Sequence, residues 1–237
     1  YSYLNNVNEG FGSTRSGFDT NAFGYNNLAS GTDYRQTDVY SYKTEATLVS
    51  FFGRVNYGFM NRYMLTATLR RDGSSRFGDN HKWGTFPSVS VAWRVSDEPF
   101  MHATSGWLDN LKVRFGFGVT GNQNGIGEYK SLSILSASGA AYYDPTSKTW
   151  KNAYTQAQNA NPDLKWESTK QWNLGIDFVL FSHLTGTLEL YHKKTSDLLW
   201  TYPVPQPPYL VGTMLANVGD LVNKGVELTL GANILKN

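Results

Sequence analysis

The sequence lacks cysteine altogether, and its 237 residues carry a formal net charge of only +2. Without cysteine there can be no disulfide and no thiolate metal site. A charge so close to zero argues against a dedicated nucleic-acid-binding protein, which would show a clustered basic surface. Long apolar runs are also missing. The longest lies near residues 178–181, far short of the ~20 residues that a transmembrane helix needs.

Charged residues are scarce as well, at 17% against roughly 25% in an average soluble domain. Aromatic residues are abundant instead, at 15%, and glycine occurs 23 times. This composition is typical of all-β proteins, including membrane barrels. The sequence opens on Tyr1 with neither a Met nor a signal peptide. Because an exported barrel needs a signal, we expect the chain to be a piece of a longer precursor.

Alternation of apolar and polar residues divides the chain into two regions. Residues 1–43 are rich in Asn, Gly, Ser and Tyr and show little periodicity, so we expect a long extracellular loop with a short helical turn near Asn21–Leu28. From residue 44 the period becomes two, which indicates strands with two different faces. Seven segments carry this pattern: residues 49–59, 63–70, 88–95, 111–120, 171–180, 184–193 and 226–234, the last with Ile234 on its apolar face.

Charged side chains within these segments all fall on the polar face. A charge that faces lipid at mid-bilayer costs roughly 2–4 kcal/mol in a barrel, but a soluble sandwich core would exclude charge equally well. In a barrel these residues would line the lumen, where they would contact an internal plug or pair with one another across neighbouring strands. They are Arg54, Arg70, Arg94, Lys112, Arg114, Asp177, Glu189, Lys193 and Glu227.

The connections between the segments alternate between short and long, with Ser96–Asn110 as an intermediate case. Short periplasmic turns and long extracellular loops are typical of outer-membrane barrels, and a Greek-key sandwich has no reason to keep that parity. Aromatic residues gather at the strand ends, which predicts two girdles at the membrane interfaces. Tyr57, Phe59, Tyr63, Trp93 and Phe181 would form the short-turn girdle, and Phe86, Trp166, Trp200 and Tyr202 the long-loop girdle.

Eight local motifs, in order along the chain, resemble the SusC/RagA family of TonB-dependent outer-membrane transporters. They are SFFGRVNY (50–57), RDGSSRFG (71–78), WGTFPS (83–88), AWR (92–94), the run from Arg114 to Gln123, NPDLKWE (161–167), NVG (217–219) and GVE (225–227). The resemblance implies an antiparallel transmembrane β-barrel of about 22 strands with a plugged lumen, of which residues 44–237 would supply about seven strands. The sequence departs from the family pattern in that it contains no recognisable plug domain, TonB box or closing strand.

The resemblance further implies a place in the outer membrane of a Gram-negative bacterium, in contact with its lipid. It implies import of oligosaccharides, or of peptides, with a SusD-like surface lipoprotein and with the TonB complex acting through the missing N-terminal region. No cofactor, nucleic acid or enzymatic activity is implied. Two alternatives remain: a soluble β-sandwich adhesin, and an outer-membrane hydrolase, which would need a nucleophile and a base brought within hydrogen-bond reach.

Candidate ligand contacts are exposed aromatic residues in the two longest loops, which could stack on sugars beside hydrogen-bonding amides. They are Tyr142, Tyr143, Trp150, Tyr154, Tyr202 and Tyr209. The competing explanation is packing within the loops or against a lid protein. The four histidines show no metal-binding spacing. Asp72, Asp79 and Asn80 could offer oxygen ligands to calcium, but Asp-Gly and Gly-Asp sequences more often mark turns.

Overall fold

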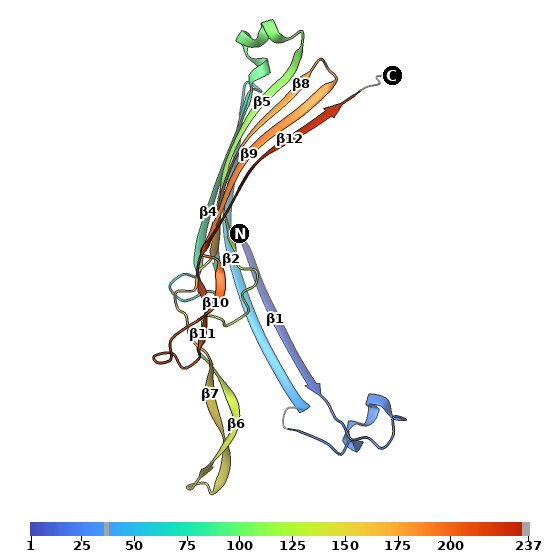
Figure 1. Cartoon of the computed structure of the whole chain (residues 1–237), viewed down its shortest axis with the longest axis vertical. Coiled ribbons are helices and arrows are strands. Elements are labelled where there is room, and N and C mark those ends of the chain that lie inside the picture. The colour runs from blue at the N-terminus through green and yellow to red at the C-terminus, as the bar shows by residue number, and fades with distance from the viewer. Residues whose placement is uncertain (36–37, 234–237) are drawn as a thin grey trace.

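An open, curved antiparallel sheet of eight strands forms the body of the molecule, in the order β1-β2-β3-β4-β5-β8-β9-β12 (Figure 1). The computed structural model describes residues 1–35 and 38–233, with the backbone alone for Gly139 and Ala140. The strands of the sheet are β1 (Ser2–Ser13), β2 (Val39–Phe59), β3 (Tyr63–Ser74), β4 (Trp83–Arg94), β5 (Leu108–Asn122), β8 (Glu167–Leu180), β9 (Leu184–Ser196) and β12 (Asp220–Ala232).

All seven predicted strands are present, and most extend beyond their apolar runs toward the long loops. The predicted position of Ile234 lies outside the described residues. The loop expected over residues 1–43 is wrong at both ends, because Ser2–Ser13 form β1 and β2 begins at Val39. β1 pairs with β2 along its whole length. The position of β1 in the sheet therefore depends on backbone hydrogen bonds to β2, which the alternation of apolar and polar residues does not reveal. Gly24–Ser30 form a 3₁₀ helix, η1, close to the expected helical turn.

The two faces of the sheet differ in polarity as the alternation predicts. Val55, Ala67 and Val89 are neighbours on one face, while Arg54, Thr68 and Ser88 are neighbours on the other. The apolar face is largely exposed, and within residues 1–35 and 38–233 no second sheet covers it. A β-sandwich would bury that face against another sheet. The arrangement therefore fits a wall whose apolar side meets lipid.

Connections at the two ends of the sheet differ in length. The short-turn end has residues 60–62, residues 181–183, and a link over 95–107 that contains η3 (Val95–Asp97) and η4 (Pro99–Thr104). The opposite end has the long connections, and two of them carry hairpins of their own: β6 (Ile134–Asp144) with β7 (Thr149–Gln158), and β10 (Leu199–Pro203) with β11 (Thr213–Asn217). These hairpins lie beyond the sheet at the long-loop end (Figure 1). No helix of the described residues is long and apolar enough to cross a membrane.

The link between β4 and β5, which is longer than a turn, is held against the sheet by Glu98. This carboxylate is buried and accepts hydrogen bonds from the Tyr63 hydroxyl, from Trp93 Nε1 at 3.0 Å and from Arg62 Nη1 at 3.3 Å. These contacts, above all the one from Tyr63, hold the pKa of Glu98 below its ordinary value of 4.5. The link therefore folds back on the strand ends as a compact cap.

A small hydrophobic core lies at the long-loop end, between the loops and the end of the sheet. It consists of Phe77, Ile126, Leu164 and Trp166, and the partly buried Phe86 packs against it. The centroids of the Phe77 and Trp166 rings are 4.5 Å apart. The girdle predicted at this end is therefore wrong for Phe86 and Trp166, because both rings pack in a loop core. Sequence position alone could not separate a ring near lipid from a ring under a loop.

Candidate ligand site at the long-loop end

A polar cavity opens where the polar face of the sheet meets the loop core. It has a volume of about 390 Å³. Strands β2 to β5 supply its wall, the segment that follows β5 supplies amide side chains, and Trp166 and Phe86 supply aromatic surface. Its lining includes Thr68, Arg70, Asp72, Phe86, Ser88, Thr120, Asn122, Gln123, Asn124 and Trp166.

An ion pair forms the charged part of this cavity. Arg70 Nε lies 2.8 Å from both carboxylate oxygens of Asp72, two residues along the same strand face, and Arg70 Nη2 donates to Ser50 Oγ at 3.2 Å. Asp72 is buried, whereas Arg70 is about half exposed. Because the two charges neutralise each other, the cavity is polar without a strong net charge.

Amide side chains form the opposite wall. Asn122 Nδ2 donates to Glu167 Oε1 at 3.2 Å, and Asn122 Oδ1 accepts from the backbone of Asn124 at 2.9 Å. The next side chain differs, since Gln123 Oε1 is buried and has no hydrogen-bond partner among the described residues. A buried acceptor without a partner costs roughly 1–3 kcal/mol, so its position calls for an explanation. A ligand donor in the cavity would satisfy it.

Buried and half-buried asparagines hold the loops around the cavity in place. Asn161 Nδ2 donates to the carbonyl of Leu215 at 2.9 Å, and Asn159 Nδ2 donates to the carbonyl of Thr213 at 3.0 Å. Asn217 binds both backbone groups of Lys165, at 2.9 Å and 2.7 Å. These side chains join the loop after β7 to the β10–β11 hairpin. The motifs at 161–167 and 217–219 thus serve to fix the loops, a role that sequence reasoning missed.

The predicted aromatic contacts fall into three settings. Tyr143 and Trp150 pair across the β6–β7 hairpin with ring centroids 5.7 Å apart. Tyr154 lies on the same side of β7 as Trp150, and both are strongly exposed, while Tyr142 lies opposite Lys151 on the other side. Tyr202 and Tyr209, in the other loop, are half-buried. None of the six lines the cavity. The aromatic residues that do line it are Phe86 and Trp166, for which the sequence predicts a place in the long-loop girdle.

On the polar face, the charged residues partly pair with one another. Arg114 binds Asp177 at 2.7 and 3.0 Å and Glu189 at 2.8 Å. Lys112 is the cross-strand neighbour of Asp177, and Glu227 is that of Glu189. Elsewhere, Arg54 Nε donates to Thr68 at 3.1 Å, Arg94 pairs with Asp97 at 3.3 Å, Arg70 pairs with Asp72, and Lys193 lies beside Gln171 and Asn223.

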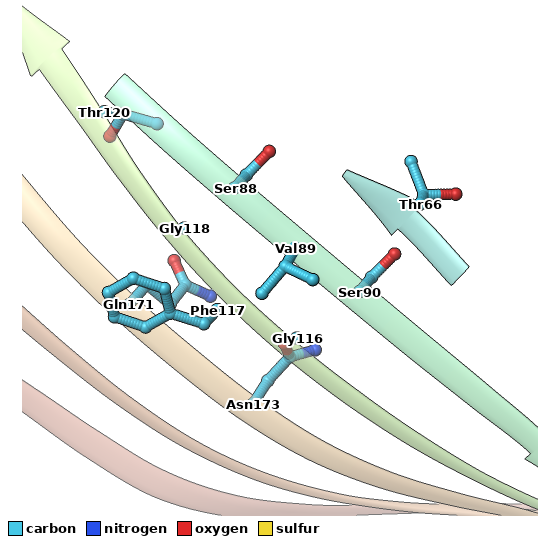
Figure 2. Close-up of a pocket in the computed structure, with 10 residues that line it drawn as sticks. All are labelled: Thr66, Ser88, Val89, Ser90, Gly116, Phe117, Gly118, Thr120, Gln171 and Asn173. Carbon is cyan, nitrogen blue, oxygen red and sulfur yellow. The ribbon is translucent and has the colours of Figure 1, made fainter. Parts of the chain in front are cut away.

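Next to the cavity, toward the short-turn end, the polar face carries a shallow groove of about 250 Å³. Figure 2 shows Ser88 and Ser90 pointing to one side of β4 and Val89 to the other. Glycine forms part of the floor, since a Cβ added at Gly116 would lie 2.3 Å from Asn173 Oδ1. The wall is therefore thin and hydroxyl-rich here, which leaves room for another surface to approach.

The calcium candidates already have other partners. Asp72 binds Arg70, Asp79 lies 2.6 Å from Lys82 Nζ, and Asn80 Nδ2 donates to Asp163 at 2.8 Å. Across the part of the chain that the structure describes, no three His, Asp or Glu residues are placed to share a metal ion. The three candidates act as turn and strand residues of the β3–β4 connection.

Comparison with known proteins identifies the family of this sheet. The family model described as TonB dependent receptor-like, beta-barrel matches residues 1–236. The chain is 40% identical over 196 residues to the TonB-dependent receptor SusC of Bacteroides thetaiotaomicron, covering 81% of this chain and 19% of SusC. It is also 40% identical to the TonB-dependent receptor P3 of Formosa agariphila, covering 100% of this chain and 23% of that protein.

A solved relative has the same fold. The RagAB peptide transporter superposes with a TM-score of 0.81 at 27% identity, covering 99% of this chain and 25% of that chain. The chain thus spans about a fifth to a quarter of the length of the relatives it matches. None of these relatives supports the sandwich adhesin. The chain belongs to the TonB-dependent receptor β-barrel family, as a SusC/RagA-type segment of an outer-membrane barrel in Gram-negative bacteria.

Proposed function

We propose that this chain forms part of the wall and the outer loops of a TonB-dependent importer for oligosaccharides or peptides. Ligand is captured at the long-loop end, in the cavity between the polar wall and the loop core. A plug elsewhere in the protein then moves under force from the TonB complex and lets the ligand pass along the polar face. A SusD-like lipoprotein covers the loops from outside. The chain itself performs no chemistry on the ligand.

The cavity at the loop end is the observation that supports this function best. It combines aromatic surface, amide donors and acceptors, and a neutralised ion pair within about 390 Å³. Pockets of this size with a few convergent polar groups are the usual binding sites of small ligands. Sugars and peptide backbones both offer many hydrogen-bond donors and acceptors, and the free acceptor of Gln123 suits a ligand hydroxyl or amide. Peptide remains a candidate because RagAB is a peptide transporter.

The exposed aromatics of the β6–β7 hairpin suit a contact with the lid. Tyr143, Trp150 and Tyr154 lie on a hairpin that extends away from the sheet (Figure 1). Aromatic residues are enriched in protein interfaces, and a hairpin that projects this far is well placed to meet a covering protein. We therefore propose that these residues, together with Tyr142, contact the lid protein. Tyr202 and Tyr209 would support the loops next to the cavity.

Binding measurements on the full-length receptor test this proposal. A panel of oligosaccharides and a peptide mixture would be titrated against the wild type, the cavity variant Gln123→Leu and the control Gln171→Leu. Gln171 lies on the polar face in the groove, outside the cavity. Loss of one hydrogen bond predicts binding weaker by about threefold to tenfold for Gln123→Leu alone. Equal loss in both variants, or in neither, would exclude the cavity as the binding site.

A further inference from the structure

Four basic side chains gather on the outer, apolar face of the sheet near the long-loop end. Lys170 and Lys194 are direct cross-strand neighbours on β8 and β9, and His192 and Lys224 are direct neighbours on β9 and β12. All four share the apolar face, because each lies an even number of residues along its strand from an apolar residue of that face. These apolar residues are Leu174 on β8, Leu190 on β9 and Val226 on β12. The three lysines are exposed. These basic residues lie on the face opposite to the lumen, so neither ligand import nor pairing with the lumen-facing charges explains their position.

Their height on the wall coincides with the edge of the hydrocarbon layer. Trp172 precedes the turn residue Phe181 by nine positions, and Lys170 precedes it by eleven. A tilted transmembrane strand needs about 9–11 residues to cross a bilayer. The next outward-facing row toward the short turns is wholly apolar, with Leu174, Leu190 and Val226 side by side. The lysines therefore stand where the apolar band ends and lipid headgroups begin.

Aromatic rings accompany the basic residues at this height. Trp172 stacks on His192 with centroids 5.6 Å apart and planes inclined by 8°. On β3 and β4, the Arg71 guanidinium lies 5.5 Å from the centroid of the Trp83 ring. Arg71 follows Arg62, in the short turn between β2 and β3, by nine positions. Tryptophan favours the membrane interface. Aromatic and basic residues thus occur together at one level on two parts of the wall.

Positive charge on this surface is only partly compensated. The outer face of β8, β9 and β12 carries a single acidic residue in its described part, Asp220, which lies 2.8 Å from Lys194 Nζ. Lys170 and Lys224 form no ion pair with any residue that the structure describes. Two unpaired ammonium groups above an apolar band call for an anionic partner that is itself anchored in lipid.

We propose that Lys170, Lys194 and Lys224, beside Trp172, bind the phosphate groups of phosphorylated lipids in the outer leaflet of the membrane. Each lysine contributes favourably near an anionic headgroup, and the acyl chains lie against the row of Leu174, Leu190 and Val226. The bound lipid seals the receptor wall at the level where the loops begin. The site is independent of the imported ligand, because it lies on the face of the sheet opposite to the cavity.

Lipid titration of the complete receptor tests the site. The receptor in detergent would be titrated with phosphorylated lipid A, with the same lipid after dephosphorylation, and with inorganic phosphate, with native mass spectrometry to count bound lipids. The test variant is Lys170→Gln/Lys224→Gln. The matched control is Lys130→Gln/Lys148→Gln, which removes two exposed lysines from the loops. Heat-modifiability on an unboiled gel confirms that each variant forms a barrel.

We expect phosphorylated lipid A to bind the wild type and the control equally, and to bind the test variant about tenfold more weakly. The dephosphorylated lipid should bind weakly and alike to all three. Equal binding of phosphorylated lipid A to the test variant and the wild type would overturn the proposal. Equal binding of both lipids to the wild type would overturn it too, since phosphate would then be irrelevant. So would saturation by inorganic phosphate at the same concentration, which would indicate a simple anion site.

Discussion

At the scale of single residues, Arg114 organises the polar face of the sheet. Its guanidinium bridges two carboxylates from different strands, Asp177 and Glu189, and Glu227 lies across from Glu189. Removing this one cation would leave three carboxylates close together on a partly buried surface. The pairing considered from the sequence is therefore present, and its centre is a bidentate arginine.

Arg114→Gln is expected to destabilise the barrel by about 1–2 kcal/mol, because charge-assisted hydrogen bonds are lost on a surface that water still reaches in part. Arg114→Lys keeps the charge but loses the planar fork, so it should recover only part of the loss. Urea unfolding of the full-length receptor in detergent measures both. Wild-type stability for Arg114→Gln would show that the network contributes nothing.

Glu98 gives the short-turn end a dependence on pH. Because its pKa is lower in the folded protein than the ordinary value of 4.5, its stabilisation is fully present above that value and is lost as the pH falls through the lowered one. We expect Glu98→Gln to lower the unfolding temperature at pH 7. The gap from the wild type should shrink as the solution becomes acidic. A gap that stays constant from pH 7 to strongly acidic conditions would contradict this assignment.

At the scale of elements, the loops at the open end behave as a folded unit and not as loose connections. Leu164 and Phe77 are almost fully buried, and loop segments far apart in sequence exchange backbone hydrogen bonds. Gly78 donates its backbone N–H to the carbonyl of Leu164 at 2.9 Å. A Cβ at this glycine would lie 2.0 Å from the carbonyl oxygen of Pro162. Only glycine permits this approach of two loop backbones.

Gly78→Ala is therefore expected to displace the segment over 161–166 from the β3–β4 connection, with a loss of about 1–3 kcal/mol. Limited proteolysis of the full-length receptor should then cut this loop sooner than in the wild type. Gly127→Ala is the matched control, because a Cβ there meets only the Lys130 side chain at 3.5 Å. Identical digestion of Gly78→Ala and Gly127→Ala would show that the close approach does not secure the loops.

At the scale of the whole molecule, the sheet has two open edges, at β1 and β12. Unpaired backbone groups at such edges are not tolerated in lipid, so this wall requires the rest of a barrel. The large exposed apolar face demands the same. Both features fit the coverage of only a fifth to a quarter of each relative.

Expression of the full-length receptor and of residues 1–237 alone, each with an export signal, tests this requirement. We expect the receptor to fractionate with the outer membrane and to migrate faster on a gel when unboiled. The 237-residue chain alone should aggregate and show no heat-modifiability, because its edges stay unpaired. A soluble, folded 237-residue chain would mean that the apolar faces pack internally, and the membrane placement would then be wrong.

Seven of the eight strands of the sheet, their two faces and the alternation of short and long connections could be predicted from the sequence. The strand β1 and the hairpin strands β6, β7, β10 and β11 could not. Period-two alternation directly reflects a wall with lipid on one side, and lipid excludes charges such as Arg114 and Glu189 from that side. The ordered motifs predicted the family, and the comparisons with known proteins confirm it. The sequence does not predict β1, because Asn and Gly in a polar strand leave no periodic signal and its ladder depends on pairing with β2.

Which residues meet at the loop end depends on the tertiary fold. Trp166 and Phe86 lie at strand ends, where an interfacial ring and a buried ring have the same sequence context. The cavity joins Arg70 of β3 to Gln123 beyond β5, and its contacts depend on loops that fold over the sheet. Such contacts are long-range and aperiodic. They come from how the chain packs, and a local pattern of residues cannot specify them.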